Sequence, residues 1–128
     1  MPFEIAVDFD GTIFEDDFPG IGDPKTDVID KLKAFKDHGA EIILWTCREE
    51  ENLEKAVEAC KEERLEFDAV NENSPSRKKM MEESAKKGDV YGLRKIYADI
   101  YVDDKALGSI EFFLQIDVAA TCESYEHR

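Results

Sequence analysis

The chain has 128 residues, a length that suits one domain, spanning 1–128, with a hydrophobic core. Its formal net charge of -14 argues against unaided binding to nucleic acid. A hydrophobic content of 42% is typical of globular proteins, and no apolar run is long enough to cross a membrane. The first residues lack the features of a secretory signal, and the three cysteines form no Cys-x-x-Cys pair. We therefore expect a cytoplasmic protein without a disulfide framework or a zinc site.

The first predicted element is a short apolar strand that ends in two acidic residues. Residues 3–7 have the pattern of a buried strand, and Asp8 and Asp10 follow it. Because side chains alternate along a strand, both carboxylates tend to point to the same side. Gly11 permits a sharp turn, and Thr12 places a hydroxyl beside it. Acids crowded at a strand end repel each other unless a cation or protons intervene, although a solvated turn after an edge strand is an alternative interpretation.

Beyond this turn the chain alternates between helix and strand patterns. Residues 14–25 are rich in Asp, Gly and Pro, and we expect a loop or short flap there. The predicted helices cover 26–38, 49–64 and a segment that begins at Pro75 and stops at Gly88. The predicted strands cover 42–45, 67–70 and 96–102.

Some side chains in the predicted helices have the spacing of core residues. Cys60 lies on the apolar face of the second helix, and Met80 and Met81 are expected to pack in the core from the third. The stretch 110–118 is apolar, and its pattern fits a strand as well as a helix. The fold of the tail after Gly108 is therefore left open.

Strands separated by helices predict an α/β fold. The expected architecture is a three-layer, Rossmann-like arrangement, in which right-handed crossovers build a mainly parallel sheet between helices. The sequence offers no insertion long enough for a sizeable cap domain. Ligands bind such sheets at the carboxyl ends of the strands, which is where the acidic pair of the first strand would lie.

Polar residues also follow the second predicted strand. Thr46 ends this strand, and a hydroxyl there, with free N–H groups at the start of the next helix, can hold a phosphate oxygen. A threonine that caps a helix is the more common explanation of such a residue. Cys47 and Arg48 join Thr46 as candidate substrate-binding residues. We interpret Cys47 as a packing residue and not a nucleophile, because a cysteine phosphatase needs a longer phosphate-binding loop before its arginine.

The last predicted strand ends in a second acidic pair, Asp103 and Asp104. Together with the first pair, four carboxylates would converge at one edge of the sheet. Such a group predicts a hard divalent cation with oxygen ligands, for which we expect Mg²⁺. Lys95 and Lys105 are the candidate cations for balancing the remaining charge.

This ordered set of residues resembles the four motifs of the haloacid dehalogenase superfamily of phosphotransferases. The resemblance covers the chain from about residue 3 to 105, and the segments 18–24 and 95–104 look like a small capless branch found in bacterial and phage genomes. The matching positions are Asp8-Phe9-Asp10-Gly11-Thr12, Thr46, Lys95 and Asp103-Asp104.

The resemblance implies a phosphohydrolase with two catalytic aspartates. Asp8 would attack phosphorus and form an aspartyl-phosphate, while Asp10 would protonate the leaving oxygen and then activate water. The resemblance also implies a Mg²⁺ site made of the Asp8 carboxylate, the Asp10 backbone carbonyl and Asp104, with Asp103 acting directly or through water. Gly11 and Thr12 would contribute to substrate binding, beside Thr46, which would hydrogen-bond the transferring phosphoryl group.

The resemblance further implies a lysine that orients the nucleophile and offsets negative charge. Lys95 is our first candidate, although it precedes the second acidic pair more closely than the lysine of the superfamily does. Lys78 or Lys79, at a predicted helix start, could have this role instead. The substrate would be phosphorylated, with a small molecule favoured. An open site of this kind can accept a large substrate, or a neighbouring subunit of a homo-oligomer can close it.

Two other functions are compatible with the same residues. A protein that keeps the fold and the metal without turnover is one, and Mg²⁺-dependent activity would separate it from an enzyme. A receiver domain of a signalling relay is the other, since it is also an α/β sheet with clustered acids. Receiver domains accept phosphate on an aspartate that ends a middle strand, whereas Thr46 stands at that position here.

Overall fold

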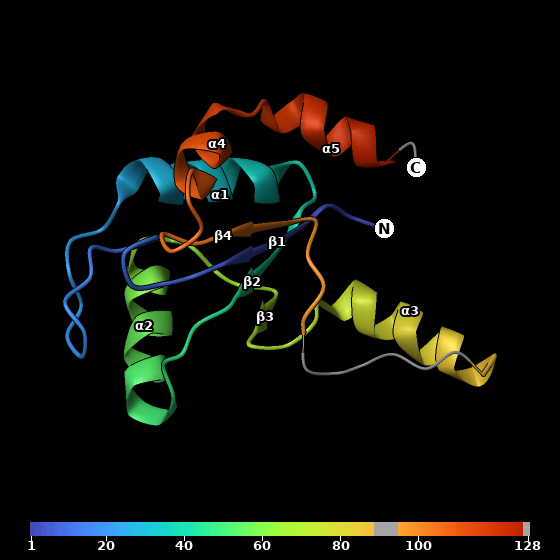
Figure 1. Ribbon diagram of the computed structural model, residues 1–128, viewed down its shortest axis with the longest axis horizontal. Helices are drawn as coiled ribbons and strands as arrows, with labels where there is room; N and C mark the ends of the chain where they lie inside the picture. The colour runs from blue at the N-terminus through green and yellow to red at the C-terminus, as the bar shows by residue number, and fades with distance from the viewer. Residues whose placement is uncertain (89–94, 127–128) are drawn as a thin grey trace.

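The structure is a computed structural model that describes residues 1–88 and 95–126. It has an α/β fold whose four strands form one parallel sheet in the order β3-β2-β1-β4, as Figure 1 shows. This confirms the predicted Rossmann-like architecture. The strands are β1 (Glu4–Val7), β2 (Glu41–Leu44), β3 (Ala69–Val70) and β4 (Ile100–Val102). The helices are α1 (Thr26–Asp37), α2 (Glu50–Glu62), α3 (Pro75–Lys86), α4 (Ser109–Gln115) and α5 (Val118–Glu126).

The main hydrophobic core lies on one face of the sheet. Alternate side chains of the strands, such as Ile5 and Ile42, pack there against α1, α4 and α5, which Figure 1 shows together on one side of the sheet. Helix α2 contributes Ala56 and Cys60 to the same core, which confirms the expected position of Cys60. No helix within the described ranges combines the length and the apolarity that a bilayer crossing requires.

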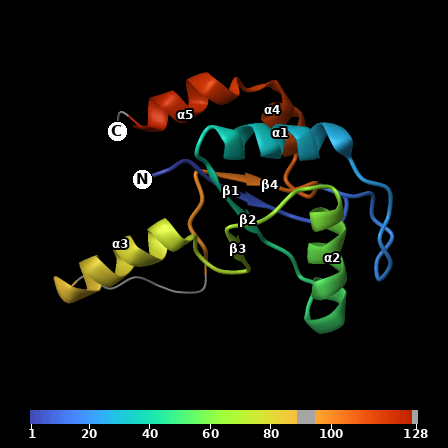
Figure 2. The ribbon, with the colours of Figure 1, turned by 180° about the vertical axis from the view of Figure 1, so that it is seen from behind.

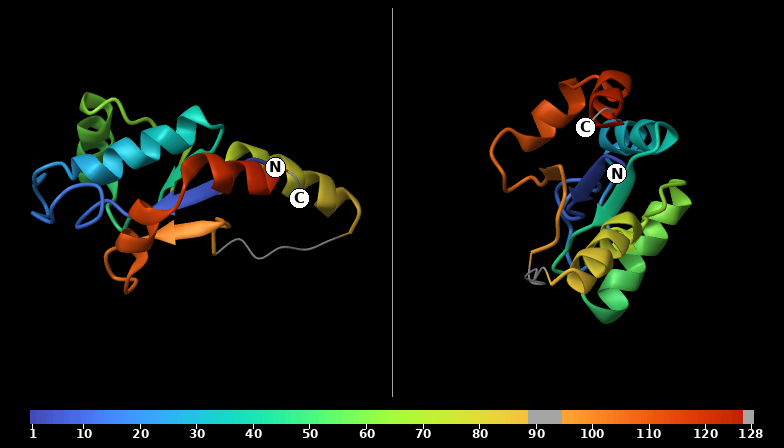
Figure 3. Two further views of the ribbon diagram at one scale, coloured as in Figure 1. Left: turned by 90° about the horizontal axis from the view of Figure 1, so that it is seen from above. Right: turned by 90° about the vertical axis from the view of Figure 1, so that its right-hand side faces the viewer.

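The opposite face of the sheet is covered more sparsely. Its apolar cluster consists of five small or medium side chains, Ala6, Ile43, Ala69, Ile96 and Ala98. Helix α3 begins beside this face and then projects away from the sheet, as Figures 2 and 3 show. None of its described residues is buried, so the expectation that Met80 and Met81 belong to the core is wrong. The helix leaves the sheet before these methionines can reach the apolar cluster.

Polar contacts hold the start of α3 to the sheet. Glu4 of β1 is fully buried, and its carboxylate accepts a hydrogen bond of 2.6 Å from the Ser74 hydroxyl. The Arg77 guanidinium donates to the other carboxylate oxygen at 2.6 Å and lies 3.7 Å from the centre of the Tyr97 ring. A buried carboxylate needs such partners, because an unpaired charge away from water is costly.

The last strand is shorter than its apolar pattern predicts. The predicted strand 96–102 is a strand only from Ile100 onward, because the Tyr101 hydroxyl holds the preceding backbone in another path. This hydroxyl donates to the Ile96 carbonyl at 2.6 Å and accepts from the Ala98 N–H at 3.2 Å. Ile96 and Ala98 instead join the apolar cluster on the face of the sheet that carries α3.

The tail after Gly108, whose pattern fits a strand as well as a helix, is helical in the structure. Residues after Gly108 form α4 and α5, which lie over the main core. Phe113 of α4 is fully buried, with its ring centre 5.5 Å from that of Phe35 in α1. A 3.6-residue period allows α4 to place this ring in the core while Phe112 stays exposed. The tail thus closes the main face of the sheet.

We predict that the Arg77→Met substitution lowers the free energy of unfolding by about 3 kcal/mol, because it leaves the Glu4 carboxylate buried without its cation. Urea denaturation would measure the loss. Lys79→Met, an exposed position on the same helix, is the control and should change stability by less than about 0.5 kcal/mol. Equal stability of the two variants would contradict the anchoring role of the ion pair.

Candidate functional site

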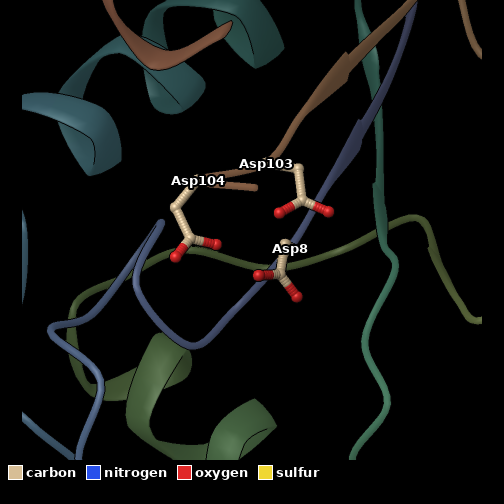
Figure 4. Close-up of side chains that lie close together, drawn as sticks. All are labelled: Asp8, Asp103 and Asp104. Carbon is tan, nitrogen blue, oxygen red and sulfur yellow. The ribbon is translucent and has the colours of Figure 1, made fainter. Parts of the chain in front are cut away.

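Three carboxylates meet at the carboxyl edge of the sheet. Val7 of β1 pairs in register with Val102 of β4, so Asp8 and Asp103 leave neighbouring strands at the same level. The Asp8 N–H donates to the Val102 carbonyl at 2.9 Å and extends this pairing by one residue. Asp8, Asp103 and Asp104 each offer an oxygen within 4.8 Å of the others, and Figure 4 shows the carboxylates of the second pair pointing toward Asp8.

The turn after β1 fixes the position of Asp104. Gly11 has a φ of +82°, and a Cβ there would lie 2.4 Å from a carboxylate oxygen of Asp104, so the close approach requires glycine. The Thr12 hydroxyl is buried and accepts the Asp104 N–H at 2.9 Å. Lys25 donates to the Gly11 carbonyl at 3.1 Å. The Thr12 side chain is buried and its hydroxyl is bonded to Asp104, so the expected contact of this side chain with substrate does not fit the structure.

The electrostatics of this cluster favour a cation or a proton. Burial is the largest cause that raises the pKa of Asp8, and together with repulsion from Asp103 and Asp104 it brings this pKa from 3.8 to about 7. The backbone N–H of Phe9 acts in the opposite direction. Lys105 lies 3.7 Å from Asp104 but is largely exposed, which weakens its compensation. An all-oxygen donor set with unbalanced negative charge fits a hard divalent cation such as Mg²⁺.

Asp10 lies outside this group of three. Its carboxylate forms a two-point ion pair with Arg48, at 2.8 Å from Nε and 2.7 Å from an Nη nitrogen. The structure therefore brings together three of the four carboxylates that the sequence predicts to converge. The fourth carboxylate, that of Asp10, is held by Arg48, which the sequence predicts as a substrate-binding residue.

Arg48 is almost fully buried, and all five of its side-chain N–H groups are used. Besides the two bonds to Asp10, the guanidinium donates to the carbonyls of Pro19, Gly20 and Asn52. Its carbon lies 4.9 Å from the centre of the Phe9 ring and 5.0 Å from that of Phe18. The expected substrate-binding role of this side chain does not fit the structure, because the guanidinium is enclosed and joins the flap at 14–25 to the end of β1.

The rest of the loop after β2 stays near the surface. Thr46 donates its N–H to the Asn71 side chain at 2.8 Å, and its hydroxyl accepts the Arg48 N–H at 3.2 Å. The Cys47 thiol is exposed, so the interpretation of this cysteine as a packing residue is wrong. At this point of the loop the next side chain, that of Arg48, is the buried one.

The candidate lysines lie on the side of the sheet that carries α3. Lys95 is exposed, with its ammonium 5.4 Å from the centre of the Tyr101 ring. Lys78 pairs with Glu72 at 2.8 Å, and Lys79 is exposed on α3. The pKa of Asp8 is shifted by burial, by acidic side chains and by a backbone N–H. Because these causes include no lysine, the shift does not favour any one of the three candidates.

The fold and this site define a Rossmann-like α/β protein with an acidic cluster at the carboxyl edge of its parallel sheet. The chain is similar to a solved structure described as that of a conserved protein from Bacteroides thetaiotaomicron, at 32% sequence identity and a TM-score of 0.69. The match covers 99% of this chain and 92% of the other. The chain therefore belongs to the same protein family as that Bacteroides protein. No protein-family model and no curated protein matches the sequence.

The raised pKa of Asp8 makes stability depend on pH. Between the unfolded value of 3.8 and the folded value of about 7, the native state holds a proton that the unfolded state has lost, so stability falls as the pH rises through this range. Asp8→Asn removes this loss. We predict that the variant is more stable than the wild type at about pH 8 without divalent cations, and that the difference disappears near about pH 4. Urea midpoints at the two pH values test this, and a less stable variant at the higher pH would contradict it.

Arg48→Lys should lower the free energy of unfolding by about 2 kcal/mol, because an ammonium cannot reproduce the planar set of five hydrogen bonds. The matched control is Arg64→Lys at an exposed position after α2, with an expected change below about 0.5 kcal/mol. Thermal or urea denaturation measures both. If the two variants lost the same small amount, the guanidinium would not be what holds the flap.

Proposed function

We propose that this protein is a Mg²⁺-dependent phosphohydrolase of the haloacid dehalogenase type, which releases phosphate from a phosphomonoester through an aspartyl-phosphate on Asp8. The observation that supports this most is the group of three carboxylates at the carboxyl edge of the sheet. The half-buried position of Asp8 between β1 and β4 suits a nucleophile that must be held in one orientation.

The donor set also fits the proposed metal ion. Asp8, Asp103 and Asp104 would hold Mg²⁺, and the backbone carbonyl of Asp10 would complete the set that the resemblance implies. When bound, the ion neutralises charge on the phosphoryl group and on the acids themselves. A divalent cation would also lower the pKa of Asp8 and so favour the carboxylate, which is the form that attacks.

The proposed reaction has two steps. An Asp8 oxygen forms a bond to phosphorus while the bond to the leaving oxygen breaks, and Asp10 gives this oxygen a proton. In the second step water attacks the phosphorus, Asp10 takes the proton of this water, and the Asp8–phosphorus bond breaks. Phosphate leaves and both aspartates return to their first state. Thr46, at the end of β2, would donate a hydrogen bond to the transferring group.

The Asp10–Arg48 ion pair sets a condition on this mechanism. Both carboxylate oxygens of Asp10 are bonded to Arg48, whereas proton transfer to a substrate requires one of them at the reacting atom. Catalysis therefore needs this carboxylate to turn away from the guanidinium. Arg48 also binds two carbonyls of the flap, so such a movement would involve the flap at 14–25.

The same ion pair favours a second candidate function. If the Asp10 carboxylate stayed on Arg48, the chain would be a phosphate-binding or metal-binding protein without turnover.

We also infer that the substrate is a small molecule and that the protein acts in the cytoplasm. The net charge of -14 supports the first inference, because it opposes the approach of a polyanion.

Phosphate release from a panel of phosphomonoesters, with and without Mg²⁺, tests the proposal. We predict Mg²⁺-dependent turnover that Asp8→Asn lowers by at least about a thousandfold, because the amide cannot act as the nucleophile. Asp104→Asn should raise the Mg²⁺ concentration needed for half-maximal activity. The control is Asp30→Asn, an exposed acid on α1, which should leave turnover unchanged.

Activity that survived in Asp8→Asn would show that the nucleophile lies elsewhere. A wild-type protein that bound Mg²⁺ but hydrolysed nothing across a broad panel would favour the second candidate function.

A further inference from the structure

We infer that a groove beside Thr46 binds the base of a nucleoside monophosphate, whose nucleoside would be the leaving group. This inference rests on the proposed function, which it extends to a substrate class. The groove has a volume of about 320 Å³ and is lined by residues at the end of β2, in the loop after β3 and in the first turns of α3. Its lining includes Trp45, Asn71, Glu72, Asn73, Lys78 and Met81.

The groove lies next to Thr46, the position expected to bind phosphate. Trp45 directly precedes Thr46 in the chain, and Asn71 accepts the Thr46 N–H at 2.8 Å. Both residues also line the groove. A phosphate held at Thr46 would therefore leave the rest of its ester beside the indole of Trp45.

The apolar part of the lining suits a flat aromatic ring. Trp45 exposes 37% of its surface, although an indole in a small protein is usually better covered. Met81 and Ile96 supply further apolar surface, and a thioether packs well against aromatic rings. Stacking on a tryptophan is a common way in which proteins hold a nucleobase, because every base has a π-face.

The polar part of the lining distinguishes a base from a plain hydrocarbon ring. Asn71 and Asn73 bring amide groups to the groove, and the Lys78–Glu72 ion pair adds a cation and an acceptor at its edge. Asn73 is buried and fixed, since its side-chain oxygen accepts the Tyr97 N–H at 2.8 Å. Donors and acceptors around an aromatic surface match the edge of a base, which carries both.

Size and charge favour a mononucleotide over a polymer. A volume of about 320 Å³ lies at the lower end of the range for ligand pockets, which is roughly 300–1,000 Å³. The net charge of the chain opposes a long polyanion. Only the leaving group of one nucleotide has to fit.

The only tryptophan of the chain is Trp45, so its fluorescence reports directly on this groove. We predict that adenosine 5′-monophosphate and adenosine both quench the fluorescence of the Asp8→Asn protein in Mg²⁺, whereas ribose 5-phosphate does not. The nucleoside lacks a phosphate, so its binding does not depend on the catalytic chemistry. Absence of quenching by both adenine compounds at millimolar concentration would overturn the inference.

A kinetic comparison separates this inference from the proposed function. Trp45→Ala should raise the KM for adenosine 5′-monophosphate at least about tenfold, with little change for ribose 5-phosphate, and Trp45→Phe should restore most of the loss. Phe112→Ala, an exposed aromatic residue on α4, is the control. Quenching without hydrolysis would support the groove and contradict the hydrolase, whereas hydrolysis with equal KM changes for both esters would overturn the groove alone.

Discussion

The pairing of β1 with β4 is the interaction on which the candidate site depends. These strands are far apart in the sequence, yet the register of Val7 with Val102 puts Asp8 beside Asp103 at the edge of the sheet. The main core holds both strands from one side, so the acids cannot move apart to relieve their repulsion. Burial of Asp8 and, after it, this forced proximity to Asp103 and Asp104 raise the pKa of Asp8. Binding of a cation would remove a cost that the fold itself imposes.

Two differently balanced groups of charges share the end of β1. The cluster around Asp8 has an excess of negative charge, whereas Asp10 is neutralised by a buried arginine two elements away in the chain. The first group keeps its negative charge unbalanced, whereas the second joins the strand to the flap through backbone carbonyls. Because Asp10 belongs to the second group, the flap and the acid–base chemistry proposed for this residue are mechanically linked.

The two faces of the sheet are closed in different ways, and the difference explains where the proposed binding groove lies. Aromatic and aliphatic side chains from α1, α4 and α5 seal the main face. The other face depends on the Glu4–Arg77 ion pair and on Ile96 and Ala98, which precede β4 and pack on this face. Since α3 leaves the sheet early, Trp45 remains partly exposed at the end of β2. A well-packed helix at that position would have covered the groove.

Local patterns in the sequence were sufficient for the parallel α/β architecture, for Cys60 in the core and for the placement of Asp8, Asp103 and Asp104 at one edge. These features follow from periodicity and from the rule that parallel strands end on the same side. Only the tertiary structure decided that Asp10 pairs with Arg48, that Met80 and Met81 stay outside the core, and that the tail is helical. Each of these depends on contacts between residues distant in the chain, such as the 38-residue separation between Asp10 and Arg48. The pattern of residues within one segment does not indicate which distant residue that segment will contact. These three features therefore could not be predicted from local sequence.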